Sequence, residues 1–278
     1  MEISGVSGTS AEFDPLVDDA PRRYVVGVDL GTTNSAVAYV DTQQQPWQVR
    51  LLKVPQLVAP AQVESRETLP SFHYQATERE RSSGAFRLPW SKNHPDWAVG
   101  VLAREEGTRS PGRIIASAKS WLCHTGVDRT AELLPWHGDP DVDRLSPVAV
   151  TARYLGHIRD AWNDQFPSDR LDQQDLVITL PASFDEVARE LTIEAAAQAG
   201  LARVDLIEEP QAAFYAWVYK HDRDWQDHVH VGQTILVCDI GGGTSDFTLI
   251  RVRPAADDDQ DSNHRIQFHR VAVGDHLI

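Results

Sequence analysis

The chain has 278 residues and a formal net charge of −15, so it can form one large domain or two lobes that share a cleft. The acidic balance argues against a nucleic-acid partner, because neutralising phosphates requires a basic face. No run of about 18 apolar residues exists, which excludes a membrane-spanning helix, and 1–23 is a small, polar leader without a secretory pattern. With only two distant cysteines, Cys123 and Cys238, a reducing, cytoplasmic location is the simplest interpretation.

The first predicted elements are strands on either side of a glycine turn. Tyr24 to Asp29 is a compact apolar run, and Ser35 to Val40 is predicted to return beside it. A third strand is predicted over 47–54, because Trp47, Val49 and Leu51 fall on one face. Such strands would hold the backbone of the turn rigidly.

The stretch that follows is interrupted by prolines and predicts a loop-rich subdomain over about 55–118. Within it we expect a short strand at 71–75, and 77–96 has the character of an insertion. Apolar spacing predicts a helix over 113–123, with Lys119 on the side opposite to its apolar residues.

Residues 146–219 alternate between helical and strand patterns. Ser146 and Pro147 predict the start of a helix that ends before Pro167. A buried strand at 176–180 is followed by Ser183-Phe-Asp-Glu186, which has the pattern of a capping box for a helix ending at Gly200. A strand at 204–207 and a helix at 211–219 complete the alternation, which predicts parallel crossover units and an α/β fold.

A polar crossing segment, 221–232, leads to a second glycine turn. Strands over 234–239 and 246–253 are predicted to flank this turn, with Cys238 inside a buried strand, and a last strand is expected over 265–273. The domain organisation we expect is a first lobe over 24–227 and the start of a second lobe over 228–278.

The two glycine turns are similar in sequence and in register. Asp239, Gly241 and Ser245 follow Asp29, Gly31 and Ser35 by the same interval (239 − 29 = 210). Consecutive small residues expose backbone amides, which form a nest for anions such as phosphate. The residues that offer this chemistry are Gly31, Thr32, Thr33 and Asn34 in one turn, and Gly241, Gly242, Gly243 and Thr244 in the other.

Asp29 and Asp239 each end a strand beside a turn, where a carboxylate could hold a hydrated Mg²⁺ through its water shell. Two hairpin turns whose polar residues only cap the local backbone are the alternative interpretation. The common register of the two turns favours a phosphate clamp.

The first turn resembles the phosphate-binding motif of the 70-kDa heat-shock (DnaK-type) chaperone family, which shares the actin and sugar-kinase fold. Three further segments resemble this family in the same order: Val177-Ile-Thr-Leu-Pro-Ala-Ser-Phe184, Ile207-Glu-Glu-Pro-Gln-Ala-Ala213 and Asp239-Ile-Gly-Gly-Gly-Thr-Ser-Asp246. The resemblance covers 24–278 apart from the 77–96 insertion. It implies an actin-like (ribonuclease-H-like) ATPase fold, with two lobes around a nucleotide cleft.

The resemblance also implies residue roles and ligands. ATP or ADP would lie with Mg²⁺ between the lobes, with the phosphates at Thr32 and Thr33 and the γ-phosphate near Thr244. Lys119 resembles the lysine that places the attacking water, and Glu209 the glutamate that orients it. Taken alone, they would be a solvated helix lysine and a carboxylate at a helix start.

Further positions resemble those that serve partner binding and signalling in the family. Pro181 and Arg189 match residues that relay the nucleotide state to the interdomain linker. Acidic Asp205 and Glu208 stand where the family's surface for J-domain co-chaperones carries a basic and an amide residue. Reversed charge predicts a weakened J-domain contact, and leaves a different co-chaperone or a nucleotide-exchange factor as expected partners.

The family pattern continues beyond the last residues of this sequence. The glycine motif that stacks adenine, a lid subdomain and the peptide-binding domain would all follow Ile278, so the second lobe is expected to be incomplete and activity of this chain alone reduced. The first hypothesis is therefore an ATPase portion of a divergent chaperone. The alternatives are a nucleotide-binding or interaction module without turnover, and a small-molecule kinase of the same fold.

Overall fold

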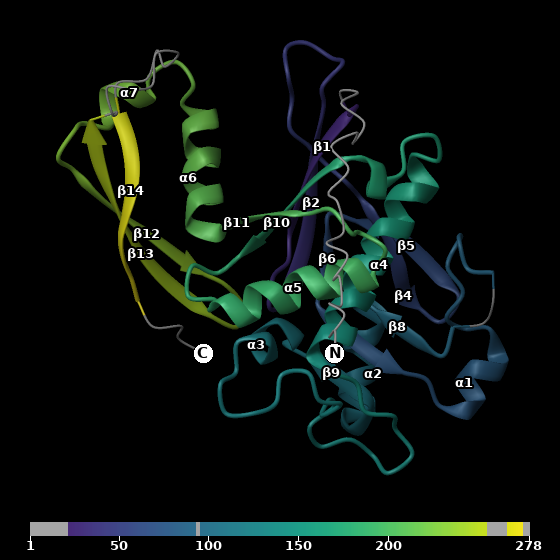
Figure 1. Cartoon of the computed structure of the whole chain (residues 1–278). Helices are drawn as coiled ribbons and strands as arrows, with labels where there is room; N and C mark the ends of the chain where they lie inside the picture. Colours follow the sequence, from purple (N-terminus) through teal and green to yellow (C-terminus); the bar gives the residue numbers. More distant parts are fainter. Residues whose placement is uncertain (1–21, 93–94, 255–265, 275–278) are drawn as a thin grey trace, which may run out of the picture.

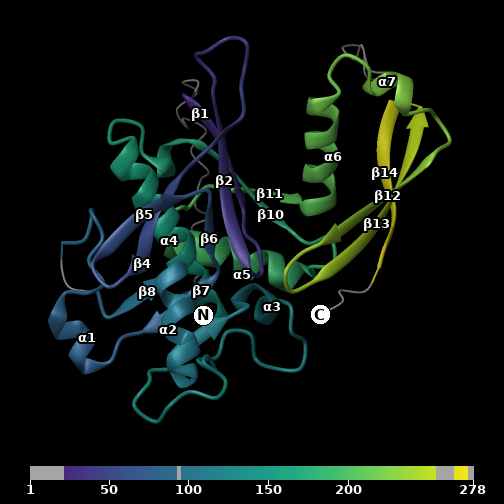
Figure 2. The ribbon, with the colours of Figure 1, turned by 180° about the vertical axis from the view of Figure 1, so that it is seen from behind.

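The structure is a computed structural model that describes residues 22–92, 95–254 and 266–274. Residues 1–21 of the predicted leader, positions 93–94 of the predicted insertion and the end of the chain after residue 274 lie outside these ranges. Figures 1 and 2 show a larger body that contains β1 and β10 beside a separate sheet of β12, β13 and β14, with α6 between them. The chain is therefore a mixed α/β protein, as predicted.

The central sheet of the larger body has the order β11-β10-β1-β2-β3, with β6 also paired to β2. β1 is parallel to β10, and β10 is parallel to β11, whereas β2 runs antiparallel to β1. The predicted crossover units are thus confirmed. The bounds are β1 Tyr24–Asp29, β2 Asn34–Asp41, β3 Arg50–Leu51, β6 Thr68–Pro70, β10 Asp175–Leu180 and β11 Asp205–Glu208.

Helices α4 (Pro147–Gln165) and α5 (Glu186–Gln198) pack on this sheet and close the main hydrophobic core. Ser146 caps α4 by accepting a hydrogen bond from the Ala149 amide at 3.1 Å, as its sequence predicts. The core includes Val26, Val28 and Ile178, all fully buried. This packing fixes the strand ends that carry the first glycine turn.

The start of α5 differs from the prediction. Asp185, not Ser183, is the N-cap, and its carboxylate accepts a hydrogen bond from the Ala188 amide at 2.8 Å. The Ser183 hydroxyl lies 3.2 Å from Asp246 Oδ1, on β13. The capping-box interpretation was therefore wrong, because an aspartate one turn before Ala188 caps as well as serine and leaves Ser183 for a contact across the lobes.

The region predicted as loop-rich contains more regular structure than expected. It forms two small sheets, one of β4 and β5 and one in the order β8-β7-β9, together with two helices. The bounds are β4 Val54–Ala59, β5 Gln62–Arg66, β7 Phe72–Gln75, β8 Trp97–Val99, β9 Ile114–Ala116, α1 Glu78–Ser83 and α2 Val101–Arg109.

Two predicted elements of the first lobe are wrong in extent. In 47–54 only Arg50–Leu51 pairs with β2. Trp47, Val49 and Leu51 are all more than half exposed, because none of the described residues covers the face they share. The helix predicted over 113–123 begins instead with strand β9, which pairs with β7. Ser117 adopts a left-handed backbone at φ 55°, so only α3 (Ala118–Leu122) is helical.

The second sheet consists of β12 (Thr234–Ile240), β13 (Ser245–Pro254) and β14 (Ile266–Val273) in antiparallel order. Helix α6 (Glu209–Lys220) contacts β12, and α7 (Trp225–His228) follows α6 in the chain. Trp225 packs with Val252 in a small core of its own. Cys238 is exposed, contrary to the prediction of a buried strand, because the outer face of this sheet has no layer over it among the described residues.

Candidate functional site

The first glycine turn joins β1 to β2 and is held from outside by Ser71. The Ser71 hydroxyl donates a hydrogen bond to the Gly31 carbonyl at 2.7 Å, and its amide donates to the Thr33 carbonyl at 2.9 Å. A side chain at Gly31 would place its Cβ 2.0 Å from the Asn34 carbonyl oxygen, so only glycine fits this turn. The turn is rigid before any ligand binds.

The second glycine turn joins β12 to β13 and closes with a hydrogen bond from the Gly241 amide to the Thr244 carbonyl at 2.9 Å. It faces the first turn at close range. A Cβ at Gly242 would lie 3.0 Å from Thr33 Oγ1, and one at Gly243 would lie 3.3 Å from Thr32 Cγ2. The two turns that the sequence paired by register are therefore opposite one another.

A cavity of about 230 Å³ lies between the turns. The residues predicted for phosphate, metal and catalysis all line it: Asp29, Gly31, Thr32, Thr33, Asn34, Lys119, Glu209, Asp239, Gly241, Gly242, Gly243 and Thr244. They come from four places in the chain, 29–34, 119, 209 and 239–244, that lie far apart in sequence. The fold thus brings the whole predicted set together.

Lys119 and Glu209 form a buried ion pair at the base of this cavity, with Lys119 Nζ donating to Glu209 Oε1. Their side chains are only 7% and 13% exposed. Lys119 comes from α3 and Glu209 begins α6, whose second residue is proline, as expected for a helix start. The interpretation of Lys119 as a solvated helix lysine is therefore wrong.

Burial raises the pKa of the Glu209 carboxyl above its ordinary value. Lys119 opposes this shift of the pKa, whereas the negative charges of Asp29 and Asp239 add to it. Burial keeps the ionised carboxylate away from water, and this disfavours ionisation more than the nearby Lys119 ammonium favours it. Glu209 therefore takes up a proton more readily than an exposed glutamate.

The charges of the cavity favour a cation. Asp29, Glu209 and Asp239 supply three carboxylates against the single ammonium of Lys119, so a polyanionic ligand would meet net negative charge unless a metal ion accompanied it. Asp29 is fixed by the Thr179 hydroxyl, which donates to its Oδ1 at 2.9 Å. Oxygen ligands on opposite sides of one cavity suit Mg²⁺, although the described residues contain no cluster of three or more His, Cys, Asp or Glu side chains at metal-binding distance.

A larger open space of about 540 Å³ adjoins the cavity and shares Asp29, Glu209 and Asp239 with it. Its other walls are mostly small and apolar, including Gly27, Ala38, Ala213 and Ala216, and it reaches the exposed Cys238. This space begins where the two glycine turns end. Its size suits a group larger than a phosphate chain.

The two residues predicted as an allosteric relay lie outside the cavity. Pro181 is buried at the end of β10, and the Arg189 guanidinium donates to Glu208 Oε1 at 2.8 Å. Arg270 on β14 also donates to this oxygen. Glu208 therefore links α5 to the second sheet through two arginines, an arrangement that no pattern in the sequence indicates.

Two residues that support the site, Ser71 and Thr179, were not predicted from the sequence. Ser71 holds the first turn and Thr179 fixes Asp29, yet neither belongs to a glycine motif. Thr179 had one visible signal, because it is the polar residue in the otherwise apolar Leu176-Val-Ile-Thr-Leu180. Ser71 had no such signal, since its partner Gly31 lies 40 positions earlier in the chain.

A sheet of parallel and antiparallel strands, facing a second sheet across two opposed glycine turns, is the arrangement of the actin-like ATPase fold. The family model described as "Hsp70 protein" matches residues 25–255. The chain therefore belongs to the Hsp70 family, and the fold predicted from its sequence is confirmed.

Similar curated proteins are chaperones. "Chaperone protein HscA homolog" of Bordetella pertussis is 32% identical over 240 residues, which cover 83% of this chain and 32% of that protein. "Chaperone protein HscA" of Enterobacter sp. strain 638 is 32% identical over 254 residues, covering 86% of this chain and 35% of that protein. The chain thus spans about a third of the length of the relatives that it matches.

This homology supports a chaperone-type nucleotide-binding domain. In the part of the chain that the structure describes, no helix is both long enough and apolar enough to cross a membrane.

Proposed function

We propose that the chain binds Mg·ATP between its two glycine turns and hydrolyses it to ADP and phosphate, as part of a 70-kDa heat-shock-like chaperone. The observation that carries this proposal is the single cavity lined by all twelve predicted residues. Family membership and the opposed turns support it.

The phosphate chain would lie between the turns, where backbone amides and the hydroxyls of Thr32, Thr33 and Thr244 can donate to its oxygens. Mg²⁺, held by Asp29 and Asp239 through water, would neutralise phosphate charge. Such a site acts by positioning and charge stabilisation rather than through a covalent intermediate.

Lys119 and Glu209 are the proposed catalytic pair. Burial of both side chains keeps their ion pair away from bulk water, so each fixes the orientation of the other. Glu209 would accept a hydrogen bond from the attacking water, and Lys119 would stabilise negative charge on the transferred phosphoryl group.

Single-turnover hydrolysis tests this function. The chain is mixed with a limiting amount of radiolabelled ATP and Mg²⁺, and phosphate release is followed with and without EDTA. We expect Mg²⁺-dependent release from the wild-type chain. Tight nucleotide binding without release would support the non-hydrolysing module, and ADP formation only with an added acceptor would support a kinase.

Partner binding and signalling belong to the same proposal. Glu208 is already paired with Arg189 and Arg270, so exposed Asp205 is the acidic group left to face a partner. We propose that this surface disfavours a standard J-domain and accepts a different co-chaperone, and that a nucleotide-exchange factor acts on the cleft. Pro181 and Arg189 would relay the nucleotide state, in a protein that works in the cytoplasm.

A further inference from the structure

A second pocket lies in the first lobe, between β4, the segment after α1, and α4. Its volume is about 290 Å³, near the lower end of the range for small-ligand sites and well above the volume that holds benzene in an engineered cavity. It shares no lining residue with the cavity between the glycine turns. Much of its wall comes from 86–92, within the 77–96 stretch that has the character of an insertion.

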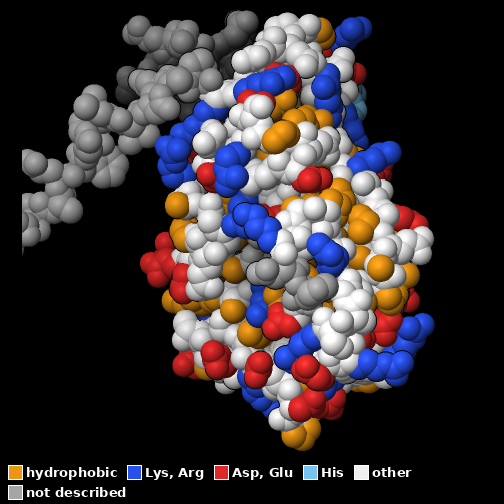
Figure 3. All heavy atoms as spheres, turned by 90° about the vertical axis from the view of Figure 1, so that its right-hand side faces the viewer, with side chains coloured by type: hydrophobic (Ala, Val, Ile, Leu, Met, Phe, Trp, Pro, Cys, Tyr) orange, Lys and Arg blue, Asp and Glu red, His pale blue; other side chains and the backbone are white. Residues whose placement is uncertain are grey.

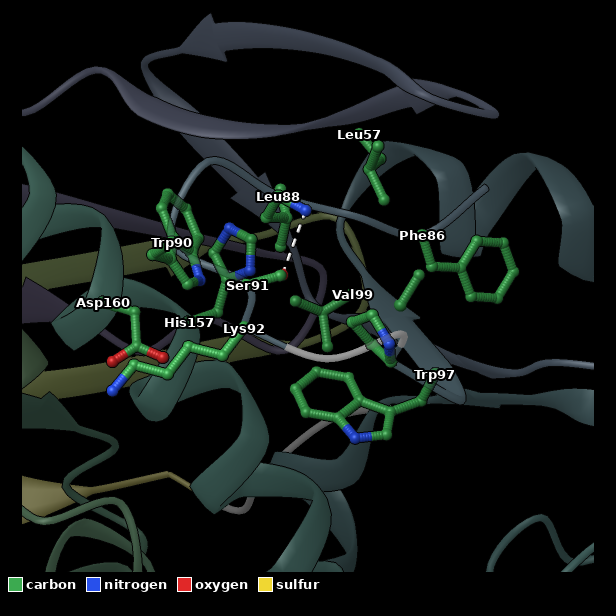
Figure 4. Close-up of a pocket in the computed structure, with 12 residues that line it drawn as sticks. Leu57, Phe86, Leu88, Trp90, Ser91, Lys92, Trp97, Val99, His157 and Asp160 are labelled. Atoms are coloured by element: carbon green, nitrogen blue, oxygen red, sulfur yellow. Dashed lines mark hydrogen bonds between the residues drawn. The ribbon is translucent and has the colours of Figure 1, made fainter. Parts of the chain in front are cut away.

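One end of the pocket is apolar and aromatic. Leu57, Phe86, Trp97 and Val99 line it, and Figure 4 shows Phe86 and Trp97 on the side away from the charged groups. The Trp97 ring is held from outside the pocket, because the Arg153 guanidinium lies 5.0 Å from its centroid. The Phe86 ring is only 2% exposed and packs edge-on against Tyr74, so Trp97 supplies the ring surface that an aromatic ligand would meet.

His157 supplies a hydrogen-bond acceptor in the pocket wall. Its side chain is buried, and its Nε2 lies 2.9 Å from the Pro55 carbonyl. Because a carbonyl can only accept, Nε2 carries the proton. Burial lowers the pKa of His157 to about 4, so at neutral pH the other ring nitrogen, Nδ1, is an acceptor, and it has no hydrogen-bond partner within the described ranges.

The other end of the pocket carries one charged residue of each sign, Lys92 and Asp160. Figure 4 shows Lys92 and Asp160 there, with their charged tips toward the same side. Asp160 already accepts hydrogen bonds from Arg159 at 2.6 and 2.9 Å, whereas exposed Lys92 has no ion-pair partner within 4.0 Å in the described residues. Figure 3 shows the side of the molecule that faces right in Figure 1, and it carries basic as well as acidic groups. The net negative charge of the chain therefore does not make this side uniformly negative.

We propose that this pocket binds a small planar aromatic monocarboxylate. The aromatic ring would lie against Trp97 at the apolar end, and the carboxylate would pair with Lys92. A ring N–H would donate to Nδ1 of His157. This arrangement uses the apolar end, the free acceptor and the free cation at once.

Calorimetric titration of indole-3-acetate into the full chain tests the proposal. We expect a Kd on the order of 0.1 mM for a ligand of this size. The N-methylated analogue, which cannot donate to His157, should bind about tenfold more weakly. Tryptamine, in which an ammonium replaces the carboxylate, should not bind. Saturating Mg·ATP should leave the affinity unchanged, since the two cavities share no residue.

Lys92→Glu should weaken indole-3-acetate binding at least about tenfold. Lys53→Glu is the matched control, because Lys53 is also an exposed lysine of the first lobe but does not line the pocket, and it should leave the affinity unchanged. The proposal is overturned if 1 mM ligand gives no binding, if Lys92→Glu binds as well as wild type, or if tryptamine or the N-methylated analogue binds equally well.

Discussion

The two glycine turns have similar sequences, but the protein holds them in different ways. The first turn ends a strand that lies between two others, with Val26 and Val28 fully buried, and Ser71 fixes its carbonyls from outside. The second turn ends β12, an edge strand of a three-stranded sheet. On the outer face of that strand Leu236 is 56% exposed and Ile240 is 72% exposed.

This difference shows how much of a binding turn depends on its surroundings. In the proposed function, glycines and hydroxyls give both turns the same capacity to bind phosphate, since the amides are supplied by the backbone. The rigidity of a turn, however, comes from the layers that pack on its strands. We therefore expect the first lobe to provide the fixed side of the site and the second sheet to provide the adaptable side.

The largest expected effect is on the free energy of unfolding. It separates a buried position in the central sheet from an exposed position in the second sheet. Ile178 in β10 is fully buried, so Ile178→Ala should lower the free energy of unfolding by about 2–5 kcal/mol through lost burial and a cavity. Leu236→Ala, in β12, should change it by less than about 0.5 kcal/mol. Urea unfolding measures both. Equal losses would mean that the outer face of the second sheet is covered in solution.

Substitutions on the two sides of the cavity should slow ATP hydrolysis to a similar extent, although the two sides are packed differently. Lys119→Ala in the first lobe and Asp239→Asn in the second should each slow single-turnover hydrolysis by about 10²–10³, with less effect on nucleotide affinity. Lys53→Ala, at an exposed lysine outside the cavity, should hydrolyse ATP at the wild-type rate. Unchanged hydrolysis in either cavity variant would refute the assigned roles.

Stability toward acid should also differ between the regions. Burial lowers the pKa of His157 in the first lobe to about 4, below the usual value of about 6.5. Between these values the unfolded chain binds a proton that the folded chain does not, so stability falls as pH drops from about 6.5 to 4, by about 3 kcal/mol in total.

The matched variants are His157→Gln and His228→Gln, compared by urea unfolding at pH 7 and pH 4.5. His157→Gln should flatten the decline of stability with falling pH, although buried His73, whose pKa is also lowered by burial, retains part of it. His228 is 54% exposed near the second sheet, and its substitution should leave the decline as in wild type. A wild-type decline in His157→Gln would show that His157 is already charged in the folded state.

The smallest expected effect is on stability and Mg·ATP affinity when equivalent glycines of the two turns are replaced by alanine. Gly31→Ala places Cβ 2.0 Å from a backbone oxygen, whereas the nearest atom at Gly241 is 3.5 Å away. Gly31→Ala should therefore cost about 1–3 kcal/mol in stability and weaken Mg·ATP binding by about ten- to hundredfold, measured by calorimetry. Gly241→Ala should stay within about twofold of wild type; equal losses would mean that both turns are equally rigid.

The later part of the first lobe followed from local patterns, whereas the two small sheets and two helices of 55–118 did not. The strand–helix alternation of 146–219 predicted the parallel strands, and Ser146, Pro147 and Gly200 marked helix ends that the structure has. Errors occurred where two local signals competed or where burial depended on a distant partner. Asp185 displaced Ser183 as the cap of α5, and Ile114–Ala116 joined a sheet because β7 offered an open edge.

The sequence by itself determined which residues are proposed for the site, because glycine turns, aspartates at strand ends and ordered motifs are local features of the chain. It identified the twelve residues that line one cavity. Only the tertiary structure decided how they are held: the Lys119–Glu209 ion pair, the support of Gly31 by Ser71 and the double pairing of Glu208. These contacts join residues far apart in sequence, and burial, which sets the raised pKa of Glu209, exists only once the layers have packed.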